Sequence, residues 1–367
     1  MQPTEGPKSS PAPKATPEPA TGSPVASQSL AVVDIHEVPT EITVLRQDYR
    51  TDGQEIVFSS GPIDSPLASA PDLYRYDRAT GARQRIFSNP NRDSNLLPIA
   101  VNDGQYAFVE INARTYGENG WGLWYMSSGA ATPRLLDQAD AQQDIPSPLP
   151  FISLSGHRMV WNAFHQTPGG SRSQLLFADL PGGQKQVLLS ARPDTEAQYW
   201  TPSIDGDHLV YSVVDYSKPD TPRYVYLMDL ADRASTPRRL DTSGRAVTPA
   251  IYGDSVVWKE ADDVFEWGTI TLFSLATGTA RKLTFGIQQQ LNYPSVGGRF
   301  VAAWGRDYGS VYVYDLERDK ALLIEHWPAS PPAASVRPLI GGDLLLWVSS
   351  TEPQGSLHFK WVGLPPR

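Results

Sequence analysis

The stretch PAIYGDSVVW, from Pro249 to Trp258, contains the pattern that decides the fold. It predicts a strand, a tight turn at Gly253 and a second strand that ends in an aromatic residue. A polar segment follows, then the alternating run TITLFSL (Thr269 to Leu275), the turn ATG and a short strand from Ala280 to Phe285. Strands bounded by turn residues at this spacing indicate a small antiparallel sheet of four strands joined by three connections.

The same unit recurs along the chain, with one anchor glycine in each copy. Successive anchor glycines are 44 to 52 residues apart, and an apolar run ending in an aromatic residue follows each of them. The anchor glycines are Gly53, Gly104, Gly156, Gly206, Gly253, Gly298 and Gly342. Short strands that repeat every 40 to 50 residues or so are typical of a β-propeller, and no ten-residue stretch shows a helical period. We therefore predict an all-β, seven-bladed β-propeller of four-stranded antiparallel blades.

The two ends of the chain predict how the ring closes. The seventh unit has only three candidate strands, around 338–340, 344–348 and 356–362. A ring left open would expose a sheet edge that promotes aggregation. The segment AVVDIHEV, residues 31–38, precedes the first unit and has the right length for the missing outermost strand. We expect this strand to close blade seven, so that residues 31–367 form one propeller domain.

The first 30 residues differ in composition from the rest. They contain seven prolines and few apolar side chains, and we expect a disordered, Pro-rich tether. The segment is similar to the spacer that follows the lipidated cysteine of bacterial lipoproteins. This similarity implies an extracytoplasmic protein, periplasmic or at the cell surface, whose lipid anchor is in a segment missing from this chain. We expect no other attachment to a membrane, because no apolar run reaches 18 residues.

Charge and cysteine content restrict the function classes. The formal net charge is −9, and because the tether sums to zero the excess belongs to the propeller. Such a surface repels phosphate backbones, so we expect no nucleic-acid partner. The chain has no cysteine, which excludes disulfides, thiolate zinc sites and cysteine nucleophiles.

The repeat resembles a known family. The pairs TDGQEIVFSS with DLYRYDRATGARQRIF, and YGDSVVWKE with ITLFSLATGTARKLT, are similar to the TolB-type propeller repeat. The resemblance covers the propeller only, because TolB has a separate α/β domain before its blades and six blades rather than seven. An Asp directly before the anchor glycine persists only at Asp52, Asp103 and Asp205. The resemblance implies the fold and leaves the function open, because such blades occur in unrelated proteins.

Candidate chemistry is sparse. The Gly-x-Ser-x-Gly elbow of hydrolases is absent. Only His165 and His326 fall in loops expected on the same rim, and TolB-like lyases that cleave pectic fragments use a His-rich metal centre, so a metal lyase stays an alternative. An acidic cluster could hold calcium, which binds six to eight oxygens, although a solvated acidic loop is the favoured interpretation and no cofactor is expected. The cluster consists of Glu260, Asp262, Asp263 and Glu266.

Aromatic residues fall into two groups. Trp161, Trp258, Trp304 and Trp347 share one place, at the end of the second strand, and are expected to pack between blades. The second group lies in or beside connections, and consists of Tyr199, Trp200, Phe265, Trp267, Tyr293, Tyr308 and Trp327.

Propeller topology places the connections on two faces. Links from the second to the third strand, and from each blade to the next, emerge on one face and are long and varied; we call it the long-loop face. The anchor-glycine and ATG-type turns emerge on the opposite, short-turn face. Function usually resides on variable loops of a rigid scaffold. Around the axis of the long-loop face we expect Gln198, Tyr199, Trp200, Gln288, Gln289, Asn292, Tyr293 and Arg337.

These patterns favour a monomeric, exported or surface-tethered bacterial binding or scaffold protein. It would recognise a protein, peptide or glycan through the long-loop face, using exposed aromatic and polar side chains. The alternative is a carbohydrate-active enzyme, a polysaccharide lyase or glycoside hydrolase, with its site at the axial mouth. A glycoside hydrolase would need two carboxyl groups roughly 5 to 9 Å apart there. The segments before the innermost strands offer amides, aromatics and one Arg but hardly any acid, so binding is favoured over catalysis.

Overall fold

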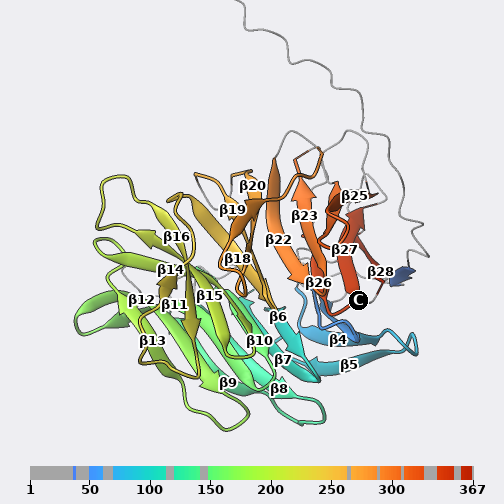
Figure 1. The fold of residues 1–367 in the computed structure, drawn as a ribbon. Coiled ribbons are helices and arrows are strands. Elements are labelled where there is room, and N and C mark those ends of the chain that lie inside the picture. Colours follow the sequence, from blue (N-terminus) through green and yellow to red (C-terminus); the bar gives the residue numbers. More distant parts are fainter. Residues whose placement is uncertain are drawn as a thin grey trace, which may run out of the picture.

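The structure is a computed structural model. It describes residues 36–38, 49–60, 69–112, 120–140, 148–262, 266–286, 290–306, 310–325, 337–350 and 357–365. Within these ranges the chain forms 28 strands in seven four-stranded antiparallel sheets and no helix (Figure 1). The innermost strands of consecutive sheets contact one another around the whole ring, from blade one to blade seven and back to blade one. The predicted seven-bladed β-propeller is confirmed.

Each blade runs from an innermost strand at the axis to an outermost strand at the rim. Blade one contains β2 (Tyr49–Thr51), β3 (Glu55–Ser60), β4 (Asp72–Asp77) and β5 (Arg83–Ser88). Blade two contains β6 (Ser94–Asn102), β7 (Gln105–Asn112), β8 (Gly120–Ser127) and β9 (Arg134–Asp140). Blade three contains β10 (Ile152–Ser155), β11 (Arg158–Thr167), β12 (Gly170–Asp179) and β13 (Gln186–Ala191). Blades four and five contain β14 (Ala197–Asp205), β15 (His208–Asp215), β16 (Arg223–Asp229), β17 (Arg238–Arg239); and β18 (Ala246–Tyr252), β19 (Ser255–Glu260), β20 (Thr269–Ser274), β21 (Ala280–Lys282). Blades six and seven contain β22 (Leu291–Gly297), β23 (Phe300–Gly305), β24 (Val311–Asp315), β25 (Lys320–Glu325); and β26 (Leu339–Gly341), β27 (Leu344–Ser350), β28 (Leu357–Gly363), β1 (His36–Val38).

The anchor glycines form the turns between the innermost and second strands. All seven have positive φ, between 54° and 100°. Only glycine adopts this conformation without a steric penalty, which explains why the repeat carries glycine at this place. The repeated sequence signal is therefore a backbone requirement of the turn.

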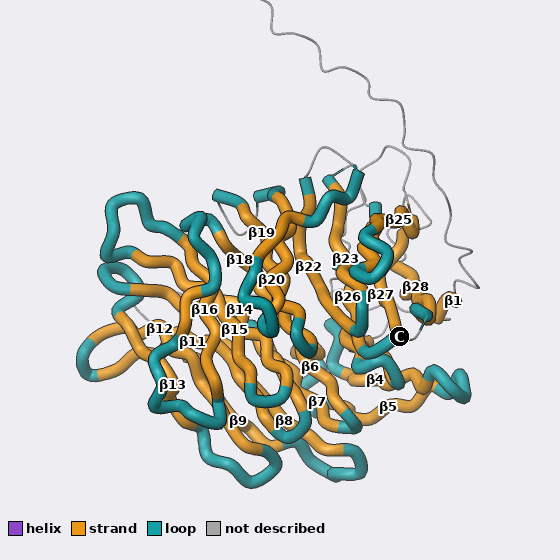
Figure 2. Tube along the Cα trace, viewed as in Figure 1, coloured by secondary structure: helices purple, strands orange, loops and turns teal. Residues whose placement is uncertain are grey.

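The N-terminal strand closes the ring. β1 pairs antiparallel with β28, with His36 opposite Trp361, and the two rings stack with centroids 4.2 Å apart. Figure 2 shows β1 beside β28 at the edge of the molecule, next to the C-terminus. The predicted closure is confirmed for residues 36–38, whereas residues 31–35 and the expected tether, residues 1–30, lie outside the described residues.

Close backbone approach also joins blade seven to blade one. A Cβ atom added to Gly341 would lie 2.5 Å from the carbonyl oxygen of Thr51, so no larger residue fits. Beside this contact, the guanidinium of Arg78 in blade one donates to Asp343 of blade seven at 2.7 Å. Glycine at this place allows the two innermost strands to meet.

Most of the apolar core lies between blades. Trp258 of blade five packs with Val210 and Val225 of blade four. Trp347 of blade seven packs with Phe300 and Val313 of blade six. The side chains of Trp161, Trp258 and Trp347 are each at most 1 % exposed, as predicted. Burying such large side chains supplies much of the stabilisation, at about 25 cal/mol per Å² of apolar surface.

Trp304 packs against the core between blades six and seven, but it is not equivalent to the other three tryptophans as predicted. It is the sixth residue after its anchor glycine, whereas Trp161, Trp258 and Trp347 are each the fifth. Successive side chains of a strand point to opposite faces, so one extra residue turns the side chain around. Ala303 occupies the buried position instead, and Trp304 is only half-buried.

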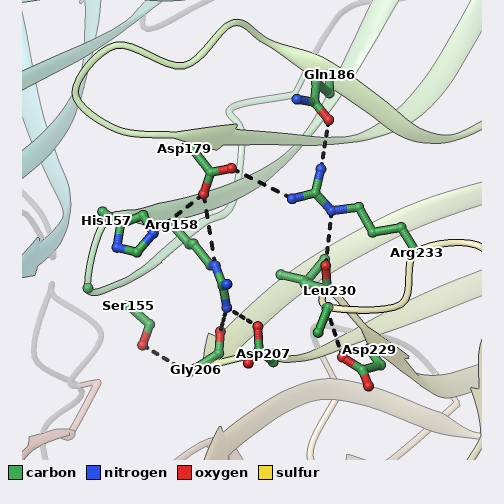
Figure 3. Close-up of polar contacts among 12 residues, drawn as sticks. Ser155, His157, Arg158, Asp179, Gln186, Gly206, Asp207, Asp229, Leu230 and Arg233 are labelled. Atoms are coloured by element: carbon green, nitrogen blue, oxygen red, sulfur yellow. Dashed lines mark hydrogen bonds and ion pairs between the residues drawn. The ribbon is translucent and has the colours of Figure 1, made fainter.

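Polar contacts join the blades on the short-turn face. Between blades three and four, Arg158 forms an ion pair with Asp207 and donates to the carbonyl of Gly206 at 3.2 Å (Figure 3). Asp179 lies between Arg158 and Arg233, with oxygen–nitrogen distances of 3.9 and 3.7 Å. These cations and carboxylates neutralise one another, so we interpret the network as a structural link between blades.

One expected loop on the long-loop face is mainly paired strand. The segment NAFHQTPGGSRS was expected to be a variable connection, but β11 and β12 continue through it and pair from Arg158 with Asp179 to Thr167 with Gly170. Only Pro168 and Gly169 lie between the strands.

In the part of the chain that the structure describes, no helix is long and apolar enough to cross a membrane.

Candidate functional site

A cavity of about 260 Å³ lies on the propeller axis, and all seven blades contribute to its lining. Most of the lining comes from the fifth, fourth and third residues before each anchor glycine. The fifth residues are Ile99, Phe151, Thr201, Thr248, Tyr293 and Arg337. Phe151 and Arg337 directly precede their innermost strands or lie one residue away, and the other four residues lie inside theirs. The cavity therefore lies within the central channel, three to five residues from the anchor-glycine turns in the direction of the long-loop face.

The backbone of three consecutive blades is kinked at this cavity. Thr201, Thr248 and Tyr293 each precede a proline and have φ of 44°, 51° and 47°. A residue before proline is normally extended, and a positive φ is unfavourable for a β-branched residue, so each kink stores about 1 to 3 kcal/mol of strain. Each kink coincides with an irregularity in the pairing of the innermost and second strands. Such bulges reorient side chains, here toward the axis.

Two arginines mark one side of the cavity. Arg50 in blade one donates to the carbonyl oxygens of Ile99 and Tyr49, both at 2.6 Å. Arg337 in blade seven lies with its guanidinium carbon 3.7 Å from the ring centroid of Tyr293, within range of a cation–π contact. The Tyr49 hydroxyl, whose pKa is raised by burial, donates to the carbonyl oxygen of Arg337 at 2.5 Å and holds this segment in place.

Aromatic side chains mark the side formed by blades three and four. Trp200 and Phe151 both line the cavity and meet edge to face with centroids 6.0 Å apart. The indole N–H of Trp200 donates to the amide oxygen of Gln198 at 3.2 Å, and Gln198 in turn donates to the carbonyl of Pro193 at 2.8 Å. Both aromatic rings are half-buried, so part of each faces the cavity and part supports it.

A second aromatic group extends outward from the cavity through blade six. Tyr293 stacks on Trp304 with centroids 6.2 Å apart, and Trp304 meets Trp267 edge to face at 4.7 Å. The half-buried Trp304 therefore supports the cavity wall and also packs against the core between blades six and seven. Trp267, one of the aromatics noted beside connections, is also half-buried.

The structure brings three of the eight residues predicted around the axis into one cavity: Trp200, Tyr293 and Arg337. Tyr199 instead packs against Tyr211 between blades, with centroids 6.2 Å apart, and burial raises the pKa of its hydroxyl. Asn292 is also buried, where its side-chain oxygen accepts from the fully buried Lys259 at 2.7 Å. Gln288 and Gln289 lie outside the described residues.

Sequence reasoning missed Arg50, Ile99, Phe151, Thr201 and Thr248. The signal that could have found most of them is their constant offset from the anchor glycines: Arg50 is the third residue before its glycine and the others are the fifth. Alternation along a strand places the third and fifth residues on the same face.

The candidate metal ligands have protein partners. His165 makes contacts through both ring nitrogens, with Gln174 at 2.9 Å and with Asp137 at 3.0 Å. In the acidic cluster, Glu260 pairs with Lys282 at 3.3 Å and Asp262 pairs with Arg245 at 2.6 Å. His326 and Asp263 lie outside the described residues, and within the described ranges no three metal-binding side chains form a cluster.

The cavity has a distinct chemical character. Its described lining contains two guanidiniums, aromatic rings, aliphatic side chains and prolines, and neither a carboxylate nor a histidine. Three serines line it as well, Ser153, Ser203 and Ser295, but the oxygen of each accepts a backbone N–H from the next blade. The arrangement can bind an apolar group and an anion, and these described residues offer no general acid or base of the carboxylate or imidazole type.

No family model matches the sequence, and no curated protein is similar to it. The fold is similar to solved propeller structures. An oligogalacturonate lyase from Vibrio parahaemolyticus superposes with a TM-score of 0.59 and 11 % identity, over 92 % of this chain and 95 % of that one. An oligogalacturonate lyase in complex with manganese gives a TM-score of 0.57 and 13 % identity over 90 % and 93 %.

A puromycin hydrolase is similar over part of its length. It superposes with a TM-score of 0.58 and 16 % identity, over 86 % of this chain and 51 % of that one. At such identities these likenesses support the propeller fold alone, because one fold carries many functions.

Proposed function

We propose that this protein is a recognition protein that binds its ligand at the axial cavity of the long-loop face. The observation that carries the proposal is the convergence of Trp200, Tyr293 and Arg337, from three blades, on one cavity. Half-buried aromatic rings beside a guanidinium are the residue types that dominate binding energy in protein interfaces. The strained backbone at Thr201, Thr248 and Tyr293 supports the same assignment, because strain of this kind gathers at functional sites.

Binding is favoured over catalysis by the lining. Glycoside hydrolases use a pair of carboxyl groups, and the described lining supplies none. A carbohydrate-active enzyme is kept as the alternative because the fold is similar to that of two oligogalacturonate lyases. Metal analysis of the purified protein, with an assay for cleavage of oligogalacturonate, tests this alternative directly.

The proposal is tested by ligand screening with matched variants. The protein would be screened against a peptide library and a glycan array. Trp200→Ala and Tyr293→Ala are each expected to weaken binding of a hit by roughly 1 to 3 kcal/mol, as expected of aromatic anchors. The control variants Thr80→Ala and Thr277→Ala change turns of the short-turn face and should leave binding unchanged. Loss of binding only in the control variants would assign recognition to the opposite face.

The cellular setting is part of the proposal. We infer that the protein acts outside the cytoplasm, on the basis of the Pro-rich first 30 residues, which resemble a lipoprotein spacer. Fractionation of the source cells and labelling with a lipid precursor would test it. Recovery of the full-length protein in the cytoplasm, without lipid, would contradict it.

A further inference from the structure

The inference below rests on the proposed function and names the chemistry of the ligand at the same cavity. The main evidence is the environment of the Arg337 side chain. Its Nε atom is buried and has no hydrogen-bond partner in the structure. No described residue forms an ion pair with its guanidinium, whose carbon lies 3.7 Å from the centroid of the Tyr293 ring. A guanidinium held beside an aromatic ring, with no carboxylate partner among the described residues, can bind an anion through its terminal nitrogens.

The charge around Arg337 supports an anionic ligand. Arg50 lies in the neighbouring blade, its side chain lines the same cavity, and it is held in position by the carbonyl oxygens of Ile99 and Tyr49. None of the described lining residues is acidic. Two cations in a partly enclosed site attract an anion strongly, because solvent screens them less than it screens charges on the open surface. The protein as a whole carries a formal charge of −9, so this local positive site contrasts with the rest of the surface.

The remainder of the lining indicates what the anion is attached to. Phe151, Trp200 and Ile152 supply apolar surface, and four prolines continue it around the axis: Pro202, Pro249, Pro294 and Pro338. A sugar needs many hydrogen-bonding partners for its hydroxyl groups. The oxygens of the three lining serines accept backbone N–H groups, Thr201 bonds to Ser212 at 2.9 Å, and the Oγ1 of Thr248 is buried without a hydrogen-bond partner. The lining therefore offers a few hydroxyl groups beside a larger apolar surface. An apolar group suits this surface better than a polyhydroxylated ring.

We propose that the axial cavity binds a carboxylate joined to an apolar group, with Arg337 holding the carboxylate and the aromatic side holding the apolar group. The source favoured by the structure is the C-terminal end of a peptide whose last side chain is apolar. The cavity, at about 260 Å³, is below the usual range for a drug-sized ligand, roughly 300 to 1,000 Å³, and suits the end of a longer chain. Capture of a terminal carboxylate is an established mode of peptide recognition.

The test uses matched probes. N-acetyl-glycyl-phenylalanine with a free carboxylate is compared with the same dipeptide as its C-terminal amide, by calorimetry and by the fluorescence of tryptophan. The acid should bind at least about tenfold more tightly than the amide, because only the acid forms a charge-assisted contact. Phenylpropionate and an oligogalacturonate serve as further probes for a free acid and for an acidic glycan.

Variants of Arg337 complete the test. Arg337→Gln should abolish the preference for the acid, and Arg337→Lys should retain part of it, because the charge remains while the planar pair of donors is lost. The control Arg238→Gln changes an exposed arginine on the outermost strand of blade four and should bind like the parent protein. Melting curves confirm that each variant is folded.

The outcomes separate this inference from the proposed function. Equal binding of the acid and the amide, or an unchanged preference in Arg337→Gln, would overturn carboxylate recognition and leave the cavity as a binding site. Binding of oligogalacturonate alone would overturn the peptide source, whereas tight binding of phenylpropionate would support the proposal with free acids as the ligand. If no probe binds while screening hits still depend on Trp200 and Tyr293, this inference fails and the proposed function stands. If no hit depends on them, both fail.

Discussion

The side-chain Oδ2 atom of Asp205 accepts a hydrogen bond of 2.6 Å from the backbone N–H of Gly253, one blade further around the ring. The same contact joins Asn102 to Gly156 at 2.8 Å and Ser155 to Gly206 at 3.1 Å. A polar residue just before an anchor glycine therefore satisfies the turn of the next blade, and Figure 3 shows the bond from Gly206 to Ser155. Blades six and seven carry a second glycine at this place, where Gly297 packs against the side chain of Ile340 and Gly341 packs against the backbone of Thr51.

Removing this acceptor should weaken the junction between blades four and five. Asp205→Ala leaves the N–H of Gly253 without its partner, and we expect the free energy of unfolding to fall by about 1 to 2 kcal/mol. Asp205→Asn keeps an acceptor oxygen and should lose less than half as much. Asp194 is exposed and forms no ion pair with another described residue, so Asp194→Ala should be within about 0.5 kcal/mol of the parent in urea denaturation. Equal losses in all three variants would contradict the role of the bond.

The repeated tryptophans should differ in their contribution to stability. Trp258→Ala and Trp347→Ala each empty a fully buried site between blades and should cost about 3 to 5 kcal/mol. Trp304→Ala removes a half-buried side chain and should cost clearly less, while it should weaken ligand binding because Trp304 supports Tyr293. Urea midpoints and binding assays measure both effects. A loss below about 1 kcal/mol in Trp258→Ala would show that this site is not a packed core.

Ring closure can be tested by truncation. Removal of residues 1–30 should leave the melting temperature nearly unchanged, because β1 is retained. Removal of residues 1–38 deletes β1, exposes the edge of β28 and should lower the melting temperature and promote aggregation. Thermal melts with light scattering compare the two proteins. Identical behaviour of both truncations and the full chain would mean that β1 does not stabilise the ring.

Acid stability should depend on the buried Asp137. Burial alone would raise the pKa of its carboxyl, but hydrogen bonds from His165, Lys185 and Trp161 outweigh burial and hold the pKa below its usual value. The carboxylate therefore stabilises the fold above the pKa of an unfolded Asp, about 3.9, and this contribution is lost as pH falls through the lower folded pKa. Asp137→Asn should cost about 1.5 to 3 kcal/mol at pH 7, because the buried carboxylate loses its charge-assisted hydrogen bonds while Lys185 is half-exposed and can be solvated.

The pH dependence separates this effect from a simple packing defect. The difference in unfolding free energy between the parent and Asp137→Asn should shrink as the pH falls below about 4. Urea denaturation at several pH values measures it. Asp179→Asn, in the half-exposed network on the short-turn face, should change stability by less than about 1 kcal/mol. A difference that does not vary with pH would mean that the charge of Asp137 is not stabilising.

The sequence alone determined the architecture of this protein. The spacing of the anchor glycines indicated seven blades because a glycine is needed wherever the turn takes a positive φ, and that need is local. The closure by residues 36–38 was also predictable, because a blade with three strands leaves an unpaired edge that another strand must cover. Trp200, Tyr293 and Arg337 could be placed together for a similar reason: the entrances to the innermost strands meet at one end of the axis.

The direction of individual side chains was decided only by the tertiary structure. Strand alternation means that a shift of one residue reverses the face a side chain occupies, and the kinks at Thr201 and Tyr293 introduce such shifts beside the cavity. Tyr199 consequently packs between blades, and Asn292 bonds to Lys259, a contact between residues 33 positions apart in the chain. The positive character of the cavity depends on Arg50 and Arg337, which are brought into adjacent blades only when the ring closes.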